Sequence, residues 1–106
     1  MDKREIARAI KEFLDENYKN NITLHMISEK LFISHSTVCH YFREVYGTTI
    51  KQYINTKRAL EAKRLIEIGV SPTVVCEKLG FYNYTTFYRI YKKQFGFSPS
   101  NKTLKK

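Results

Sequence analysis

The feature that most constrains the fold is an internal repeat, in which residues 34–47 align with residues 83–96 without a gap. Each copy begins with a residue that favours helix N-caps and ends with a glycine that favours helix C-termini. Apolar residues occupy the same positions in both copies: Val38 and Phe87, Tyr41 and Ile90, Phe42 and Tyr91, Tyr46 and Phe95. The repeat therefore predicts two helices of equal length, each burying one face.

A shorter match precedes each copy of the repeat. The segment Ser28–Leu31 matches Cys76–Leu79, and one additional residue lies in the second connecting turn. Each unit is thus a short helix, a tight turn and a longer helix, the arrangement of a helix-turn-helix. Short helical hairpins also recur by chance in all-α proteins, but the matched caps and glycines favour a true duplication. Two copies in one chain can present two DNA-binding helices, as the two subunits of a dimer do.

The rest of the chain also has a helical pattern. The whole chain has only four glycines and two prolines, and this small number of helix-breaking residues favours long helices. We expect an all-α fold, with two helix-turn-helix subdomains (1–48 and 69–106) joined by a long central helix (49–68) in a single domain, 1–106. The expected helices are a first one around Ile6–Leu14, Leu24–Leu31 capped by Thr23, 34–46, 49–68, Pro72–Leu79 and 83–95.

The charge of the chain points to an anionic partner. Lys and Arg number 19 against 10 Asp and Glu, a formal net charge of +9, and neutralised phosphates release condensed counterions. Charge alone does not distinguish DNA, RNA and membrane surfaces. No apolar run approaches the roughly 18 residues of a membrane span, and the N-terminus lacks the apolar stretch of a signal peptide. We therefore expect a cytoplasmic protein without a membrane partner.

The faces opposite the apolar stripes carry the candidate DNA-binding residues. Each begins with a small hydroxyl residue, continues with a longer donor and ends with a cation: Ser36, His40 and Arg43 on the first helix, and Thr85, Arg89 and Lys92 on the second. Small residues permit close approach, Arg or His reaches base acceptors, and the last cation meets phosphate. Thr86 adjoins the second face, and Tyr84, Tyr88 and Lys93 flank it. The alternatives are ordinary solvated charges for Arg43, Lys92 and Lys93, and packing at the domain edge for Tyr84 and Tyr88.

At these residues the sequence resembles the DNA-binding domain of the AraC/XylS family of bacterial transcriptional regulators. The second unit carries the most specific stretch, Gly80-Phe81-x-x-x-x-x-Phe87-x-Arg89-x-Tyr91-Lys92-Lys93-x-Phe95-Gly96-x-Ser98-Pro99. The first unit and the linker add Ile22-Thr23-Leu24, Ile33-Ser34, Tyr41-Phe42-Arg43, Gly47, Tyr53-Ile54, Arg58 and Ala62-x-x-Leu65-Ile66. The resemblance covers essentially the whole chain.

The resemblance implies about seven helices and two recognition helices, about 34–46 and 83–95, in successive major grooves of double-stranded DNA. It adds Thr37 to the base-reading residues, which are then Ser36, Thr37, His40, Thr85, Thr86 and Arg89, with Arg43, Tyr84, Tyr88, Lys92 and Lys93 at phosphates or the edge. As partners it suggests RNA polymerase and an N-terminal sensor or receiver domain. It implies transcription regulation, with no enzymatic activity and no cofactor.

Three departures from the family pattern stand out. The usual Pro-x-x-Tyr-Arg ending is replaced by Pro99-Ser-Asn-Lys-Thr103, which puts the last short helix in doubt. Cys76 stands where a small Ala is usual, and we expect it to be buried. His40 stands where Arg is common, which weakens guanine reading by the first unit.

The remaining alternatives concern other classes of function. His35 and Cys39 are spaced i, i+4, which can ligate zinc, but two ligands do not close a metal site. No charged partner marks Cys39 as a redox switch beyond the neighbouring histidines. We therefore expect no metal. The chief rival to DNA binding is a basic helical module that binds protein or RNA, which would not require matching donors on two repeated helices.

Overall fold

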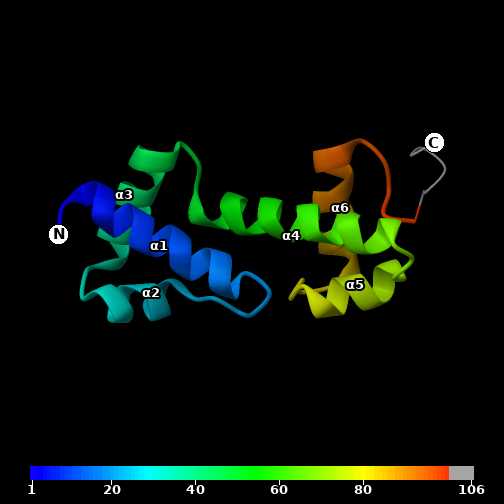
Figure 1. The fold of residues 1–106 in the computed structure, drawn as a ribbon, viewed down its shortest axis with the longest axis horizontal. Coiled ribbons are helices and arrows are strands. Elements are labelled where there is room, and N and C mark those ends of the chain that lie inside the picture. The colour runs from blue at the N-terminus through cyan, green and yellow to red at the C-terminus, as the bar shows by residue number, and fades with distance from the viewer. Residues whose placement is uncertain (101–106) are drawn as a thin grey trace. The chain divides into compact units, whose positions relative to one another are not determined.

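The computed structural model describes residues 1–100, and in this part of the chain all regular secondary structure is helical. The helices are α1 (Lys3–Asn17), α2 (Leu24–Leu31), α3 (His35–Tyr46), α4 (Ile50–Glu67), α5 (Pro72–Lys78) and α6 (Tyr84–Phe95) (Figure 1). The predicted all-α class is confirmed. The expected seventh helix, after Pro99, falls mostly outside the described residues. None of the helices within residues 1–100 combines the length and the apolar content needed to cross a bilayer.

Local capping explains most helix boundaries. The side chains of Thr23, Ser34 and Asn83 accept hydrogen bonds from the backbone N–H groups three residues later, as expected of N-caps. Gly47 and Gly96 end α3 and α6 in the left-handed conformation, with φ of 72° and 84°. The repeated helices therefore begin and end at equivalent positions.

The predicted boundaries of three helices need correction. The first helix is longer than its apolar stripe, because Asp2 and Glu5 form a capping box ahead of it. The central helix starts at Ile50 because Thr49 and Gln52 exchange the same reciprocal bonds. The helix α5 ends one residue earlier than predicted, because Leu79 is the C-cap and no longer a helical residue.

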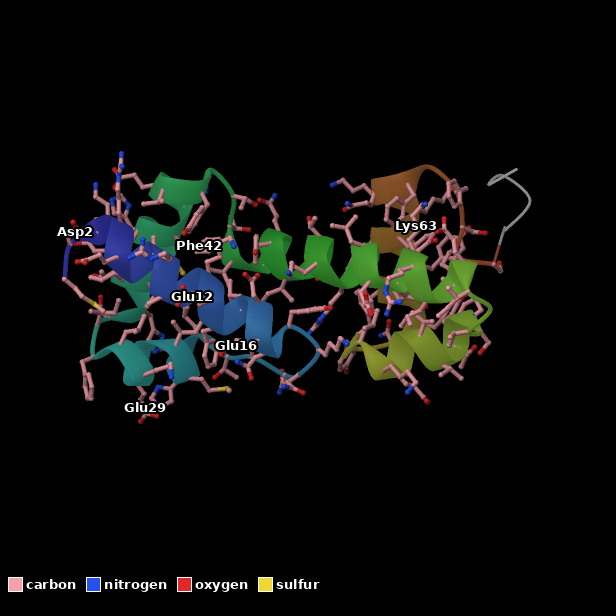
Figure 2. All side chains as sticks on the ribbon, viewed as in Figure 1. Asp2, Glu12, Glu16, Glu29, Phe42 and Lys63 are labelled. Atoms are coloured by element: carbon pink, nitrogen blue, oxygen red, sulfur yellow. The ribbon has the colours of Figure 1, made fainter. Side chains whose placement is uncertain are left out.

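The chain divides into two compact units, Met1–Ile54 and a second from Asn55 onward, and the boundary lies within α4. In the first unit, α1 packs on α3 and α2, and the buried residues are Ile10, Leu14, Ile27, Val38 and Phe42. The ring of Phe42, labelled in Figure 2, lies 5.1 Å from Tyr46 and 5.5 Å from Tyr53 between centroids. Phe42 thus fixes which face of α3 is turned inward.

The second unit has an aromatic core of its own. Phe87 is fully buried, and its ring centroid lies 4.9 Å from Phe81, 5.4 Å from Tyr84 and 5.7 Å from Tyr91. Cys76 is buried in this cluster, as the family resemblance implies. Because Phe87 and Tyr91 lie one turn apart on α6, they fix the rotation of that helix about its axis.

The two connecting turns share one backbone geometry. The N–H of Ile33 donates to the carbonyl of Ser28, and the N–H of Phe81 donates to the carbonyl of Cys76, both at 3.2 Å. Before each donor, one residue adopts the left-handed conformation: Phe32 (φ 58°) in the first turn and Gly80 (φ 81°) in the second. The repeat is therefore a repeat of structure as well as of sequence.

Candidate nucleic-acid interface

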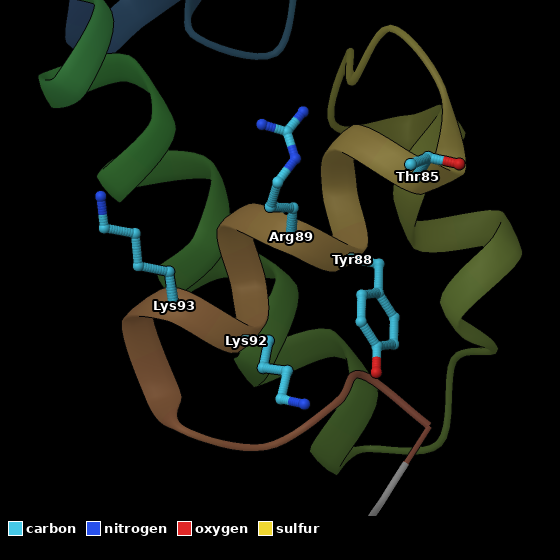
Figure 3. A pocket seen from close by; sticks show the side chains of 5 residues that line it. All are labelled: Thr85, Tyr88, Arg89, Lys92 and Lys93. Atoms are coloured by element: carbon cyan, nitrogen blue, oxygen red, sulfur yellow. The ribbon is translucent and has the colours of Figure 1, made fainter.

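The outward face of α6 gathers five of the predicted site residues. Thr85, Tyr88, Arg89, Lys92 and Lys93 are all exposed and line one open pocket (Figure 3). They come from three successive turns of the helix, on the side opposite the buried rings of the core. The face therefore combines a hydroxyl, a phenol, a guanidinium and two ammonium groups on one rigid element.

The cations on this face are available to an external anion. Arg89 and Lys93 form no ion pair within residues 1–100, and Lys92 places its Nζ 6.0 Å from the centre of the Tyr88 ring. A cation over an aromatic face is held weakly enough to reorient toward a phosphate. The guanidinium of Arg89 carries the donor fork that matches paired acceptors on guanine or on phosphate.

One predicted residue at the start of α6, Thr86, is less accessible than the helical pattern indicates, and a second, Tyr84, contacts the core. Thr86 is half-buried, and its N–H donates to the Asn83 side chain at 2.8 Å. Tyr84 packs edge-on against Phe87, and burial raises the pKa of its hydroxyl. Tyr84 is nevertheless 38% exposed, as Tyr88 is, so it contacts the core ring of Phe87 and also reaches solvent.

The outward face of α3 has the same layout with different chemistry. Ser36, His40 and Arg43 are exposed, whereas Val38 and Phe42 are fully buried on the opposite face. Thr37 is half-buried, and its hydroxyl oxygen accepts a hydrogen bond from the Ser34 hydroxyl at 2.9 Å. Of the predicted residues on α3, Thr37 is thus the one most engaged within the protein.

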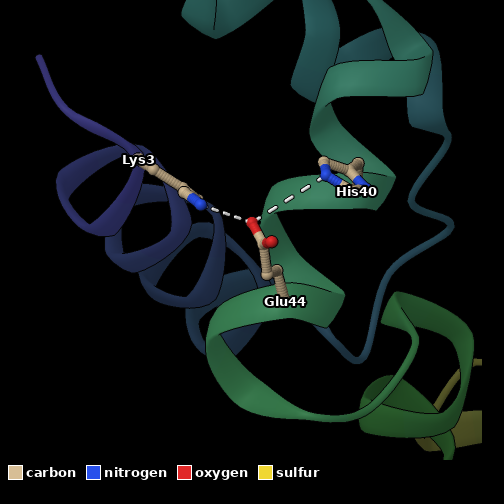
Figure 4. A network of polar contacts seen from close by, with 3 residues as sticks. All are labelled: Lys3, His40 and Glu44. Carbon is tan, nitrogen blue, oxygen red and sulfur yellow. Dashed lines mark hydrogen bonds and ion pairs between the residues drawn. The ribbon is translucent and has the colours of Figure 1, made fainter.

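A polar network that sequence reasoning missed lies beside His40. Lys3 Nζ donates to Glu44 Oε1 at 2.5 Å, and His40 Nε2 lies 3.8 Å from the same oxygen (Figure 4). The hydrogen bond and charge of Lys3, and then the nearby His40, hold the pKa of the Glu44 carboxyl below its ordinary value. The i, i+4 spacing of His40 and Glu44 was a usable signal. The contact with Lys3 was not, because it depends on the packing of α1 against α3.

The candidate metal and redox groups do not assemble into a site. The rings of His25 and His35 meet edge-on at 5.9 Å between centroids, and Cys39 is exposed. Within residues 1–100, no three histidine, cysteine or acidic side chains converge on a point that could hold a metal ion.

Comparison with known proteins identifies relatives of this chain. Residues 27–103 match the family model described as a helix-turn-helix domain. The chain is 31% identical over 90 residues to the uncharacterized HTH-type transcriptional regulator YdiP of Escherichia coli, and 32% identical over 98 residues to YisR of Bacillus subtilis, also so described. These alignments cover 84% and 92% of the chain but 30% and 34% of the relatives. The chain thus spans about a third of the length of the curated relatives it matches.

Solved structures share the fold. A probable AraC family transcriptional regulator from Rhodopseudomonas palustris superposes with a TM-score of 0.83 at 24% identity, over 95% of this chain and 96% of that one. The C-terminal domain of the response regulator yesN from Fusobacterium nucleatum gives 0.79 at 26% identity, over 87% and 91%. The DNA-binding domain of AdpA, solved with a target DNA, gives 0.76 at 24% identity, over 89% and 85%.

Proposed function

This chain belongs to the AraC-type helix-turn-helix family of transcriptional regulators, and we propose that it binds duplex DNA by inserting α3 and α6 into successive major grooves. Sequence-specific DNA binding for transcription regulation is the activity of this family, and enzymatic catalysis is not. The family assignment therefore supports the predicted family, the predicted function and the prediction that the chain is not an enzyme.

One observation carries the proposal for the two helices. Each recognition helix buries two matched apolar residues, Val38 and Phe42 on α3 and Phe87 and Tyr91 on α6, and so turns the matched opposite face outward. A major groove admits one α-helix, and side chains on its exposed face reach base edges. A basic module for RNA or protein binding, the rival interpretation, does not require two such matched faces.

The residue roles follow from accessibility and chemistry. We assign base reading to Ser36, His40, Thr85 and Arg89, with Thr37 and Thr86 as supporting contacts, because cap bonds and partial burial restrain those two. We assign phosphate or edge contacts to Arg43, Tyr84, Tyr88, Lys92 and Lys93.

The wider context of the protein is also a proposal. Relatives include an uncharacterized response regulatory protein of Staphylococcus epidermidis at 28% identity and the transcriptional regulatory protein HptR of Staphylococcus aureus at 26%. This chain matches 35% of the length of each. We infer that the domain works in the cytoplasm of a bacterium as the output part of a longer regulator. An N-terminal sensor or receiver domain would then control it, and RNA polymerase would be its downstream partner.

The decisive experiment is selection of binding sites from a random duplex library, repeated with point variants. Arg89→Ala should cost roughly 1–3 kcal/mol of binding free energy and relax the preference at one or two base pairs. Lys93→Ala should weaken binding to every sequence alike and lower the salt slope by about one unit. Arg8→Ala, an exposed cation on α1, is the control for loss of charge away from the recognition helices.

Two results would overturn this assignment. If Arg89→Ala selects the same sequence as the unmodified chain, α6 does not read bases through that side chain. If structured RNA competes as well as the selected duplex does, the domain is not specific for double-stranded DNA.

A further inference from the structure

The positive charge of the chain is divided very unequally between its two units. Residues 55–106 hold eleven Lys and Arg against three Asp and Glu, a net +8, whereas residues 1–54 hold eight against seven, a net +1. Without the three lysines beyond residue 100, the second unit still carries +5. Nearly all of the electrostatic attraction to DNA therefore originates in the second unit.

The same inequality appears at equivalent positions of the recognition helices. Through the repeat, Arg89 of α6 corresponds to His40 of α3, and Lys93 corresponds to Glu44. The three cations of α6 have no acidic neighbour on their helix, whereas α3 carries one Arg and one Glu. Where the second unit offers phosphate an ammonium group, the first unit offers it a carboxylate.

The Glu44 carboxylate is exposed and only partly neutralised. Its side chain is 46% accessible, and its two basic neighbours, Lys3 and His40, lie 2.5 Å and 3.8 Å from the same oxygen, Oε1 (Figure 4). The pKa of Glu44 is lowered by the hydrogen bond from Lys3, so the group is ionised at neutral pH. An exposed anion on a DNA-facing helix repels the phosphate backbone at close range.

We infer that the two units do unequal work on DNA: the second unit anchors the chain on the phosphates, and Glu44 keeps the first unit from binding DNA independently of sequence. This inference rests on the proposed function. Phosphate contacts supply affinity for any duplex, whereas base contacts supply discrimination. A carboxylate that weakens phosphate contacts lowers the affinity of the first unit for every duplex, so this unit binds stably only where base contacts add to its affinity. Glu44 thus limits the affinity of the first unit for phosphates and reads no base.

The test measures affinity and salt dependence on a random-sequence duplex and on a duplex selected by the unmodified chain. Glu44→Gln should tighten binding to the random duplex roughly two- to fivefold, and Glu44→Lys should also steepen the salt slope by about one unit. The affinity for the selected duplex should rise by a similar factor in both variants, because the gain does not depend on sequence. Lys93→Gln, at the equivalent position of α6, should act in the opposite direction.

The control is Glu29→Gln on α2. Glu29 is also exposed and also lies i+4 from a histidine, with Oε2 3.3 Å from His25 Nε2, but it is not on a recognition helix (Figure 2). This variant changes net charge and a His–Glu pair in the same way, and it should remain within about twofold of the unmodified chain. A thermal melt of each variant confirms that it folds.

The outcomes separate this inference from the proposed function. If Glu44→Gln binds the random duplex no better than Glu29→Gln does, or strengthens binding only to the selected duplex, Glu44 has no such role. If the unmodified chain does not prefer its selected duplex, the proposed function itself fails, whatever the Glu44 variants do.

Discussion

Replacing Phe32 with glycine should stabilise the first unit. Phe32 adopts the left-handed backbone conformation, at φ 58° and ψ 42°, and it is the non-glycine residue with positive φ within residues 1–100. The left-handed conformation costs an L-residue roughly 1–2 kcal/mol, and glycine adopts it without that cost. The second unit has Gly80 at the equivalent place, which shows that the turn accepts glycine.

The expected magnitude is a small difference of three terms. Relief of strain gains about 1.5 kcal/mol, and the greater freedom of glycine in the unfolded chain costs roughly 0.5–1 kcal/mol. The side chain is 94% exposed, so its burial is worth only about 0.3 kcal/mol for a ring of roughly 200 Å². The net stabilisation is about 0.5 kcal/mol, or an increase of roughly 2–4 °C in Tm for a unit of this size.

Urea and thermal unfolding measure this difference, and Tyr82→Gly supplies the matched control. Tyr82 is 91% exposed in the equivalent turn of the second unit, but its φ is not positive. Only the entropy term applies there, so Tyr82→Gly should destabilise the protein by about 0.5–1 kcal/mol. Opposite signs for the two variants support the argument from strain. If Phe32→Gly destabilises the protein as much as Tyr82→Gly does, Phe32 is not strained and the reasoning is wrong.

Three further predictions concern thiols, pH and the spacing of the DNA site. A thiol reagent should modify the exposed Cys39 rapidly and Cys76 slowly, because burial and the neighbouring Glu77 raise the pKa of Cys76 and lower its thiolate fraction. Bound DNA should protect Cys39 from the reagent. Equal rates of modification of the two cysteines, measured by mass spectrometry, would contradict the burial of Cys76. The folded-state pKa of Glu44 is lowered from an ordinary 4.5, so its pairing with Lys3 stabilises the fold above that value and loses this effect as pH falls through the lowered pKa. Lys3→Gln should therefore lower Tm slightly at pH 7 and not at all at pH near 2. An equal loss of Tm at both pH values would show that the pairing of Lys3 with Glu44 does not stabilise the fold. The 18 residues of α4 form a helix of roughly 27 Å, and a rigid helix cannot extend to a wider spacing of the DNA site. Inserting about 5 or about 10 bp between the halves of the selected site should therefore abolish two-site binding. Recovery with the insertion of about 10 bp, which is a full turn of DNA, would exclude a rigid link.

The helices could be predicted because their signals are local. Thr23, Ser34 and Asn83 cap helices through side-chain bonds to residues only three positions away, and Gly47 and Gly96 end them through their own backbone freedom. The burial of the apolar stripes on α3 and α6 follows from helical periodicity in the same way. Where one helix serves two cores, as α4 does, the pattern is less regular and the boundary was off by one residue at each end.

The candidate site was predictable in outline but not in its electrostatics. Periodicity identifies the outward faces, yet it treats Thr37 and Thr86 as fully available, whereas both are partly enclosed at the capped first turn. The bond from Lys3 to Glu44 joins residues 41 positions apart, so it follows from tertiary packing and leaves no local signal. Phe32 is a similar case, because the hydrogen bond from Ile33 to Ser28 imposes a backbone conformation that an aromatic residue does not favour by itself.

The duplication explains how one chain can carry two recognition helices of different charge. Stability depends on the inward positions, where Phe42 and Tyr91 are both buried and aromatic, so the fold constrains these positions equally in both units. The outward positions contribute little to either core, and exposed charges are worth little to stability. Glu44 and its counterpart Lys93 can therefore differ in sign at little cost in folding. Because the residues that fold the domain and those that meet DNA lie on opposite faces of the same helices, an outward substitution should change binding much more than it changes Tm.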